Sequence, residues 1–205
     1  MTRNVRTLTL LSLTFVLFQL PGCSKSAIQI PVPISLANTG LNEFDVAAGV
    51  PKELSGAFSF DAPLKIGSGS LEIAADSIRI EPSNNGQGKR PATQQVIADC
   101  ADACAGAGVD SATCDSVCSQ NVLHVHVWIG DADAITANCE DGDEYMFLVQ
   151  LDDGGVPTSI SASPSSLNAA TILRLNNGEF GACISIISPI DGTVFIDDLI
   201  FNVGL

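Results

Sequence analysis

Positive charge is scarce in this 205-residue sequence. Nine lysines and arginines face 23 aspartates and glutamates, which leaves a net charge of −14 at neutral pH. From residue 91 onward, Arg174 is the only base against 16 acids. A field of this sign repels nucleic acid and anionic lipid surfaces, and it attracts cations and basic partners. The composition therefore argues against nucleic-acid binding.

Motifs typical of catalysis are missing as well. The sequence contains no Gly-x-Ser-x-Gly turn, no glycine-rich phosphate loop and no His-Glu-x-x-His. Carboxylates are so numerous that no single pair stands out as an acid and a base. The sequence therefore predicts a protein that is not an enzyme.

Histidine is limited to His124 and His126, which share one face of a predicted strand with Trp128. Two histidines at i and i+2 can chelate a transition metal, and a tryptophan face can stack on a sugar. Because the chain holds no third histidine, a polar or half-buried sheet face is the favoured interpretation. No metal is assigned there.

Long apolar runs are absent apart from one near the N-terminus. Arg3 and Arg6 precede a run from Leu8 to Leu20 that has little polar interruption. A helix that crosses a hydrocarbon core of roughly 30 Å needs about 20 residues, so this run is too short for a permanent span. The pattern predicts a signal peptide.

The next feature is Leu20-Pro21-Gly22-Cys23, which resembles the bacterial lipobox. The resemblance implies that residues 1–22 are removed as a lipoprotein signal peptide and that Cys23 carries diacylglycerol and further acylation such as palmitate. Residues 23–205 would then form a single lipid-anchored domain with seven bases against 23 acids, a charge of −16. Ser24 stands where an Asp commonly retains lipoproteins at the inner membrane, which favours the outer membrane.

Six cysteines remain once Cys23 is assigned to lipid. They are Cys100, Cys104, Cys114, Cys118, Cys139 and Cys183. An even number of cysteines in an exported chain predicts a disulfide framework, here of up to three bridges.

Residues 92–120 differ in composition from the rest of the chain. They are rich in alanine, with Gly106-Ala107-Gly108 in the middle and Asp110 or Ser111 as the N-cap of a second helix. This composition predicts a helical hairpin inserted between two strands.

The cysteines of this hairpin form two pairs spaced i, i+4, and each pair lies on one face of a helix. Antiparallel packing places Cys104 opposite Cys114 and Cys100 opposite Cys118. The spacing resembles the twin Cys-x3-Cys hairpins of plant α-hairpinins and small mitochondrial chaperones, and the resemblance implies these same nested bridges. A zinc site made of the four thiolates is the alternative, which an oxidising compartment disfavours.

A third bridge follows by elimination. Cys139 and Cys183 are the cysteines left over, and they lie in or next to two predicted strands. In the chain-entropy model, disulfides that close loops of this size contribute roughly 2–4 kcal/mol each.

Alternating apolar runs separated by Gly, Pro, Asn and Asp make up most of the remaining chain. They cover 28–36, 54–60, 70–80, 121–129, 145–151, 182–187 and 193–203. Pro31 and Pro33 make the first run an edge strand or an extended lead-in. The pattern predicts a mainly β fold, an antiparallel β-sandwich or jelly roll that carries the disulfide-stapled helical hairpin. Residues 163–178 have both helical and strand signals and are left open.

Acidic residues are concentrated in the segment 131–153, which contains no base. They are Asp131, Asp133, Glu140, Asp141, Asp143, Glu144, Asp152 and Asp153. Oxygen ligands at this density suit Ca²⁺, but Ile135 and Ala137 break the EF-hand template. A solvated acidic loop is the favoured interpretation, with structural Ca²⁺ as the alternative and no metal ligands assigned.

The last run, Gly192 to Phe201, contains an apolar-Ile-Asp-Asp-apolar sequence. It resembles the closing strand of galactose-binding-like and carbohydrate-binding jelly rolls. The resemblance implies that Asp197 or Asp198 lies near a structural Ca²⁺.

These patterns together predict a membrane-anchored envelope lipoprotein that acts as a non-catalytic binding or structural module. A carbohydrate-binding jelly roll with structural Ca²⁺ is the second hypothesis, and a glycan-directed hydrolase with paired carboxylates is the third. The expected partners are a membrane, through the lipid, and an envelope protein or a glycan.

Overall fold

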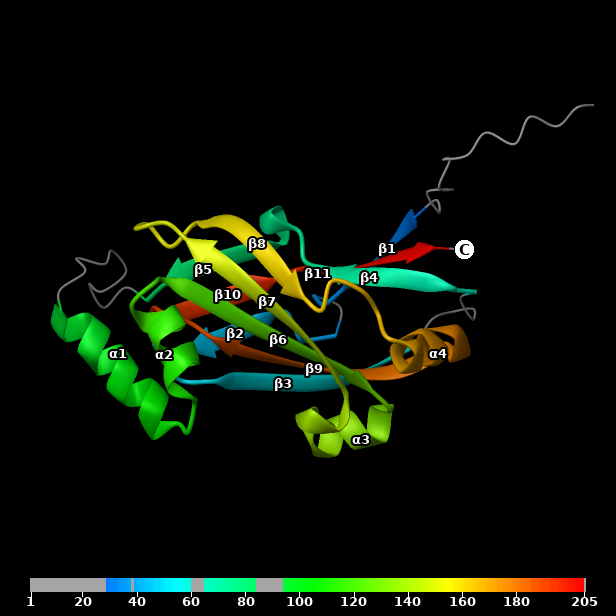
Figure 1. Ribbon diagram of the computed structural model, residues 1–205, viewed down its shortest axis with the longest axis horizontal. Coiled ribbons are helices and arrows are strands. Elements are labelled where there is room, and N and C mark those ends of the chain that lie inside the picture. The colour runs from blue at the N-terminus through cyan, green and yellow to red at the C-terminus, as the bar shows by residue number, and fades with distance from the viewer. Residues whose placement is uncertain (1–28, 38, 60–64, 84–93, 205) are drawn as a thin grey trace, which may run out of the picture.

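The computed structural model describes residues 29–37, 39–59, 65–83 and 94–204. The predicted signal peptide, the lipobox and Cys23 lie outside these residues. The described chain is mainly β, with three antiparallel sheets packed together and small helices at their margins (Figure 1). None of its helices has the length and apolar character that crossing a membrane would need.

One layer of the structure is a five-stranded sheet. Its strands, in spatial order, are β3 (Lys52–Ser59), β9 (Glu179–Ile187), β6 (Val122–Gly130), β7 (Asp143–Leu151) and β8 (Pro157–Ser163). Every neighbouring pair is antiparallel. The strands β3, β6, β7 and β9 confirm four of the predicted runs, whereas β8 lies in a stretch that the alternation analysis did not predict.

The opposite layer consists of two three-stranded sheets that share one continuous stretch of chain. Strand β10 (Gly192–Ile196) pairs with β2 (Glu43–Val46) and β5 (Ile78–Pro82), and β11 (Asp198–Gly204) pairs with β1 (Gln29–Ser35) and β4 (Ser68–Glu72). Strand β1 contacts only β11 in this sheet, which confirms the edge position predicted for the proline-containing run. Strand β2 was not predicted.

The two predicted runs 70–80 and 193–203 are each broken in two, which corrects the expectation of single strands. Asp197 separates β10 from β11, and its backbone hydrogen bonds lie outside the regular strand pairings. Its carbonyl accepts from the Leu36 amide at 2.8 Å, and its own amide donates to the Ser77 carbonyl at 2.9 Å. Ser77 is the last residue of the short helix η1 (Ala75–Ser77), and Leu36 directly follows β1, so Asp197 bonds to two segments that have themselves left their strands.

The core lies between the two layers and is almost entirely aliphatic and phenylalanine. Val127 and Ile184 of the five-stranded sheet and Val194 and Phe201 of the opposite layer are completely buried. Because side chains alternate along each strand, this inner face uses every second residue, and the antiparallel sandwich predicted from the sequence is confirmed.

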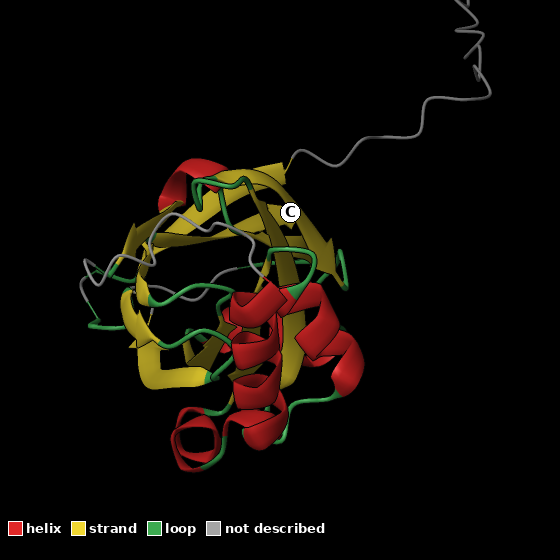
Figure 2. Cartoon of the chain, turned by 90° about the vertical axis from the view of Figure 1, so that its left-hand side faces the viewer, coloured by secondary structure: helices red, strands yellow, loops and turns green. Residues whose placement is uncertain are grey.

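Two helices between β5 and β6 confirm the predicted hairpin. They are α1 (Gln94–Gly106) and α2 (Ser111–Cys118), and Figure 2 shows them side by side at one end of the sheets. Asp110 is the N-cap of α2, because its carboxylate accepts from the amides of Ala112 and Thr113 at 3.0 Å each.

The segment left open by the sequence divides between a strand and a helix. Strand β8 ends at Ser163, and helix α4 (Ala169–Asn177) follows, capped by Asn168 and ended by Gly178 at φ 83°. Thr171 and Leu175 of α4 are completely buried and close one open end of the sandwich.

A short helix, α3 (Ala132–Ala137), packs on the sheet through Ile135, which is 1% exposed. Gly130, Gly142 and Gly181 surround this side chain. A Cβ on Gly130 would lie 2.7 Å from Cγ1 of Ile135, and one on Gly181 would lie 2.8 Å from Cα of Ala132. The three glycines therefore form the niche into which Ile135 fits.

The predicted disulfide pairing is confirmed. Cys100–Cys118 and Cys104–Cys114 join α1 to α2, with Cα–Cα distances of 5.7 Å in both bridges. Cys139–Cys183, at 5.4 Å, ties the short helix η2 (Cys139–Asp141) to β9.

The niche around Ile135 makes Gly181→Ala a test of the docking of α3. We expect a loss of about 1–3 kcal/mol in the free energy of unfolding, because the added methyl overlaps the backbone of Ala132. Gly106→Ala is the matched control. It adds the same methyl group at a helical position where the new Cβ would have no neighbouring atom within 4 Å, and it should be neutral or stabilising by up to about 1 kcal/mol. Urea unfolding of both variants measures the difference, and equal effects would contradict the niche.

Candidate functional site

Strand β6 separates apolar from polar side chains between the two faces of the five-stranded sheet. Val125 and Val127 are completely buried on the inner face. His124, His126 and Trp128 alternate with them and lie on the outer face, as the sequence predicted.

The outer face is covered near both ends. Helix α2 lies over His124, and Ile187 of β9 packs with Val117 and the hairpin cysteines. Helix α3 covers the other end through the Ile135 niche (Figure 1). We call the face between the two covers the outer strip. It consists of His126 and Trp128 on β6, Ser185 on β9, and Glu144 and Met146 on β7.

Three rings form a row along the outer face of β6. The ring centroids of His124 and His126 are 6.1 Å apart, and those of His126 and Trp128 are 5.5 Å apart, with planes inclined by 27° and 16°. His124 lies under α2, whereas His126 and Trp128 are half-buried in the outer strip. The row therefore connects the covered end of the outer face with its open part.

Glu144 joins this row from the neighbouring strand. Its Oε1 lies 2.6 Å from Nδ1 of His126, and the two side chains are 50% and 18% exposed. The carboxylate fixes the orientation of the imidazole. Sequence reasoning counted Glu144 among the loop acids and missed this pair, because the register that sets Glu144 opposite Trp128 is not visible in the sequence.

His124 is buried and only partly satisfied. It is 4% exposed, its Nε2 lies 3.0 Å from the Ser116 hydroxyl, and its Nδ1 finds no hydrogen-bond partner among the described residues. Burial, and secondly repulsion from His126, lowers the pKa of His124 to about 4, while Asp110 opposes the shift. His124 is therefore neutral at pH 7.

The acids of residues 131–153 disperse in the structure. Asp143 and Asp131 both face Arg174, at 2.7 and 3.3 Å, and Glu144 faces His126. Asp152 accepts from the amides of Gly154 and Val156 in a turn. Within the described part of the chain, no group of three or more His, Cys, Asp or Glu could hold a metal ion.

The acidic pair near the C-terminus has a structural setting of its own. Asp197 is exposed at the break between β10 and β11, and Asp198 is half-buried where β11 begins. The predicted place near a structural Ca²⁺ gains no support from this geometry, because the backbone bonds of Asp197 account for the irregular step between the sheets.

Carboxylates line two of the surface clefts. A cleft of about 320 Å³ between β3 and α3 contains one acid, Glu53. A shallower cleft of about 490 Å³ contains Asp45, Glu81 and Asp191. Each of these three is engaged locally, by Thr193, Arg79 and the Ala48 amide respectively. A general acid needs a carboxyl in apolar surroundings, which this open polar cleft does not offer.

Comparison with known proteins finds no matching family model, curated protein or solved structure. Evidence for a function therefore comes from the site itself.

Because the acids are dispersed, we expect divalent cations to affect the melting temperature without regard to their identity. At matched ionic strength, Ca²⁺ and Mg²⁺ should raise the melting temperature by the same amount, because both only screen repulsion between exposed carboxylates. NaCl at that ionic strength is the control. A rise several degrees larger in Ca²⁺ would reveal a specific site, since Mg²⁺ rarely fits a Ca²⁺ cage.

Proposed function

We propose that the protein is a lipid-anchored module of the bacterial cell envelope that binds its ligand, without catalysis, on the outer strip. The lipobox that ends at Cys23 supports the anchor. The disulfides support export, because all six remaining cysteines are paired and such frameworks belong to oxidising compartments.

The start of the sheet supports a short tether. Strand β1 begins at Gln29, so five residues separate it from Cys23, and they reach about 20 Å at most when extended. Strand β1 lies at the end of the molecule opposite the α1–α2 hairpin (Figure 1). An anchor at Cys23 would therefore hold β1 near the membrane and direct the hairpin away from it.

The placement of Trp128 is the observation that carries the binding function. It is the only tryptophan of the chain, and it lies half-buried on the outer face beside His126 and Glu144 rather than in the core. An indole combines a large apolar area with a hydrogen-bond donor, which is why tryptophan is enriched where proteins bind ligands and partners.

An envelope protein and a glycan are the two candidate ligands. A glycan is favoured by the pairing of Trp128 with Glu144, since a sugar can place its apolar face against the indole and donate hydroxyls to the carboxylate. The mature charge of −16 favours uncharged or cationic ligands over anionic ones. A hydrolase has less support, because the carboxylates of the clefts described above either stand alone or are engaged by neighbouring groups.

Trp128→Ala tests the outer strip. On an array of neutral, amino and acidic glycans, and on immobilised envelope proteins, the retained ligand should bind at least about fivefold more weakly, because a lost aromatic contact is worth about 1 kcal/mol or more. Phe195→Ala is the matched control, since Phe195 lies half-buried against Arg79 in the opposite layer. Unchanged binding by the Trp128 variant, or equal losses in both, would place the ligand elsewhere.

Cys23→Ser tests the anchor. The substitution should abolish incorporation of labelled palmitate and leave either uncleaved precursor or soluble product. Pro21→Ser is the control, because it keeps the cysteine and should stay lipidated. Palmitate labelling of the Cys23→Ser protein at the original level would refute the lipoprotein assignment.

A further inference from the structure

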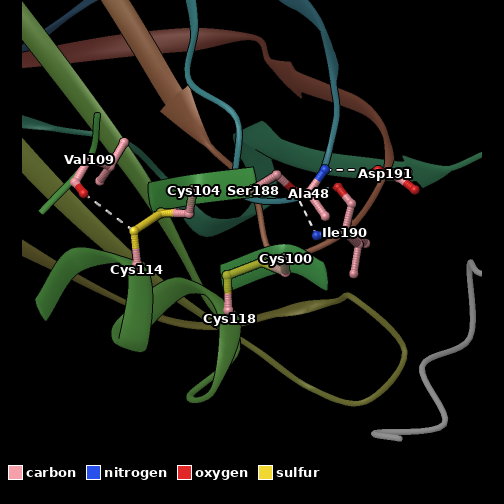
Figure 3. The surroundings of a disulfide bond; sticks show 9 residues. All are labelled: Ala48, Cys100, Cys104, Val109, Cys114, Cys118, Ser188, Ile190 and Asp191. Atoms are coloured by element: carbon pink, nitrogen blue, oxygen red, sulfur yellow. Dashed lines mark hydrogen bonds between the residues drawn. A yellow bond between two sulfur atoms is a disulfide. The ribbon is translucent and has the colours of Figure 1, made fainter. Parts of the chain in front are cut away.

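The α1–α2 hairpin is attached to the sheet without a covalent cross-link. Its two disulfides, Cys100–Cys118 and Cys104–Cys114, run between its own helices (Figure 3). Cys139–Cys183, by contrast, ties η2 to β9. The hairpin is thus an internally cross-linked unit. Apart from the chain itself, which runs from α2 into β6 through residues 119–121, its attachment to the sheet depends on packing and hydrogen bonds.

The packing that holds the hairpin involves a small set of side chains. Val117 and Cys118 are completely buried and cluster with Ile187 of β9. On the other side, Gly49 lies so close to α1 that a Cβ there would be 2.4 Å from the Cys100 carbonyl oxygen. The disulfide sulfurs therefore face the sheet and the 47–50 loop, and the described cysteines of the hairpin are at most 5% exposed.

His124 is the polar group inside this interface. It faces Ser116 of α2, Leu148 of β7 and Ile187 of β9. The titratable groups that act on it are His126 on its own strand and Asp110 at the N-cap of α2. The interface accommodates a neutral imidazole, because Nε2 of His124 forms a hydrogen bond with the Ser116 hydroxyl. An imidazolium would bury a second N–H donor at Nδ1, which has no described partner.

We infer that the hairpin is an acid-operated latch: protonation of His124 releases α1 and α2 from the sheet as one disulfide-linked unit and uncovers His124 and Ile187 beside the outer strip. This inference depends on the fold and on neither the lipid anchor nor the ligand.

The direction of the pH effect follows from the pKa of His124 in the two states. In the docked hairpin, burial and then repulsion from His126 lower this pKa to about 4. The negative charge of Asp110 acts in the opposite direction and raises it. In the released state it returns to about 6.5. Docking is therefore unaffected above pH 6.5, weakens as the pH falls from about 6.5 to about 4, and changes no further below that. Each unit of difference between the two pKa values changes the docking equilibrium by a factor of ten, so acid weakens docking by about 300-fold at most.

Asp110 sets the main opposing contribution. Its hydrogen bonds with Thr113 and Ala112 lower its own pKa, so it stays charged over most of this window and attracts a protonated His124. Glu144 is held by His126 and lies further along the row. Release therefore requires that the burial of a charged imidazole outweigh the attraction from Asp110.

The rate at which a phosphine reduces the hairpin disulfides measures release, since the buried sulfurs must open to react. The full chain is compared with His124→Phe at the same pH, which cancels the reagent's own pH dependence. The ratio of rates, wild type over variant, should rise by about 70-fold between pH 7.5 and 4.5, the factor given by pKa values of 4 and 6.5. The ratio for Cys139–Cys183 should stay constant.

Two results would overturn the latch. A constant ratio for Cys100–Cys118 and Cys104–Cys114 would show that His124 does not control docking. A parallel rise for all three disulfides would show general acid unfolding instead of hairpin release. If phenylalanine disturbs the fold, His124→Gln supplies a neutral hydrogen-bonding side chain for the same comparison. Ser116→Ala should speed reduction at both pH values and keep the pH response.

Discussion

Strand β9 is buried on both of its faces, and the rest of the structure is arranged around that burial. Ile184 and Ile186 point into the sandwich and are completely buried against the opposite layer. On the outer face, Gly181 lies under α3 and Ile187 lies under the hairpin. A two-layered sandwich covers one face of each sheet. The outer side of β9 therefore needs additional covers, which the helices provide.

Those covers are too short to be stable as separate helices. Isolated helices below about 12–15 residues are marginal in water, and α2 and α3 have 8 and 6 residues. Each is stabilised in a different way. Helix α3 has Ile135 in a glycine niche with Cys139–Cys183 directly after it. Helix α2 is cross-linked to α1 and docks on the sheet through packing and the Ser116–His124 hydrogen bond, without a disulfide to the sheet. One cover is therefore fixed to the sheet and the other can leave it.

Arg174 has a structural role that its scarcity as a base makes conspicuous in the sequence. Arg174, the only base from residue 91 onward, is used where α4 closes the sandwich, between Asp143 and Asp131. The same carboxylate of Asp143 accepts from Thr171, which in turn accepts from Tyr145. The one lysine or arginine of this half is thus part of a partly buried polar network and is engaged by two of the acids. The excess of acids would disfavour anionic ligands at the proposed binding face, the outer strip.

Short-range patterns in the sequence determined most of the strands, the hairpin, the nested cysteine pairs and the common face of His124, His126 and Trp128. Each depends on a period of two residues along a strand or on i, i+4 spacing along a helix, which neighbouring residues set by themselves. Only the tertiary structure decided the strand order, the break at Asp197, the pairing of Glu144 with His126 and the burial of His124 under α2. These depend on which distant segments meet, since register and cover come from the packing of the whole chain and not from any local period.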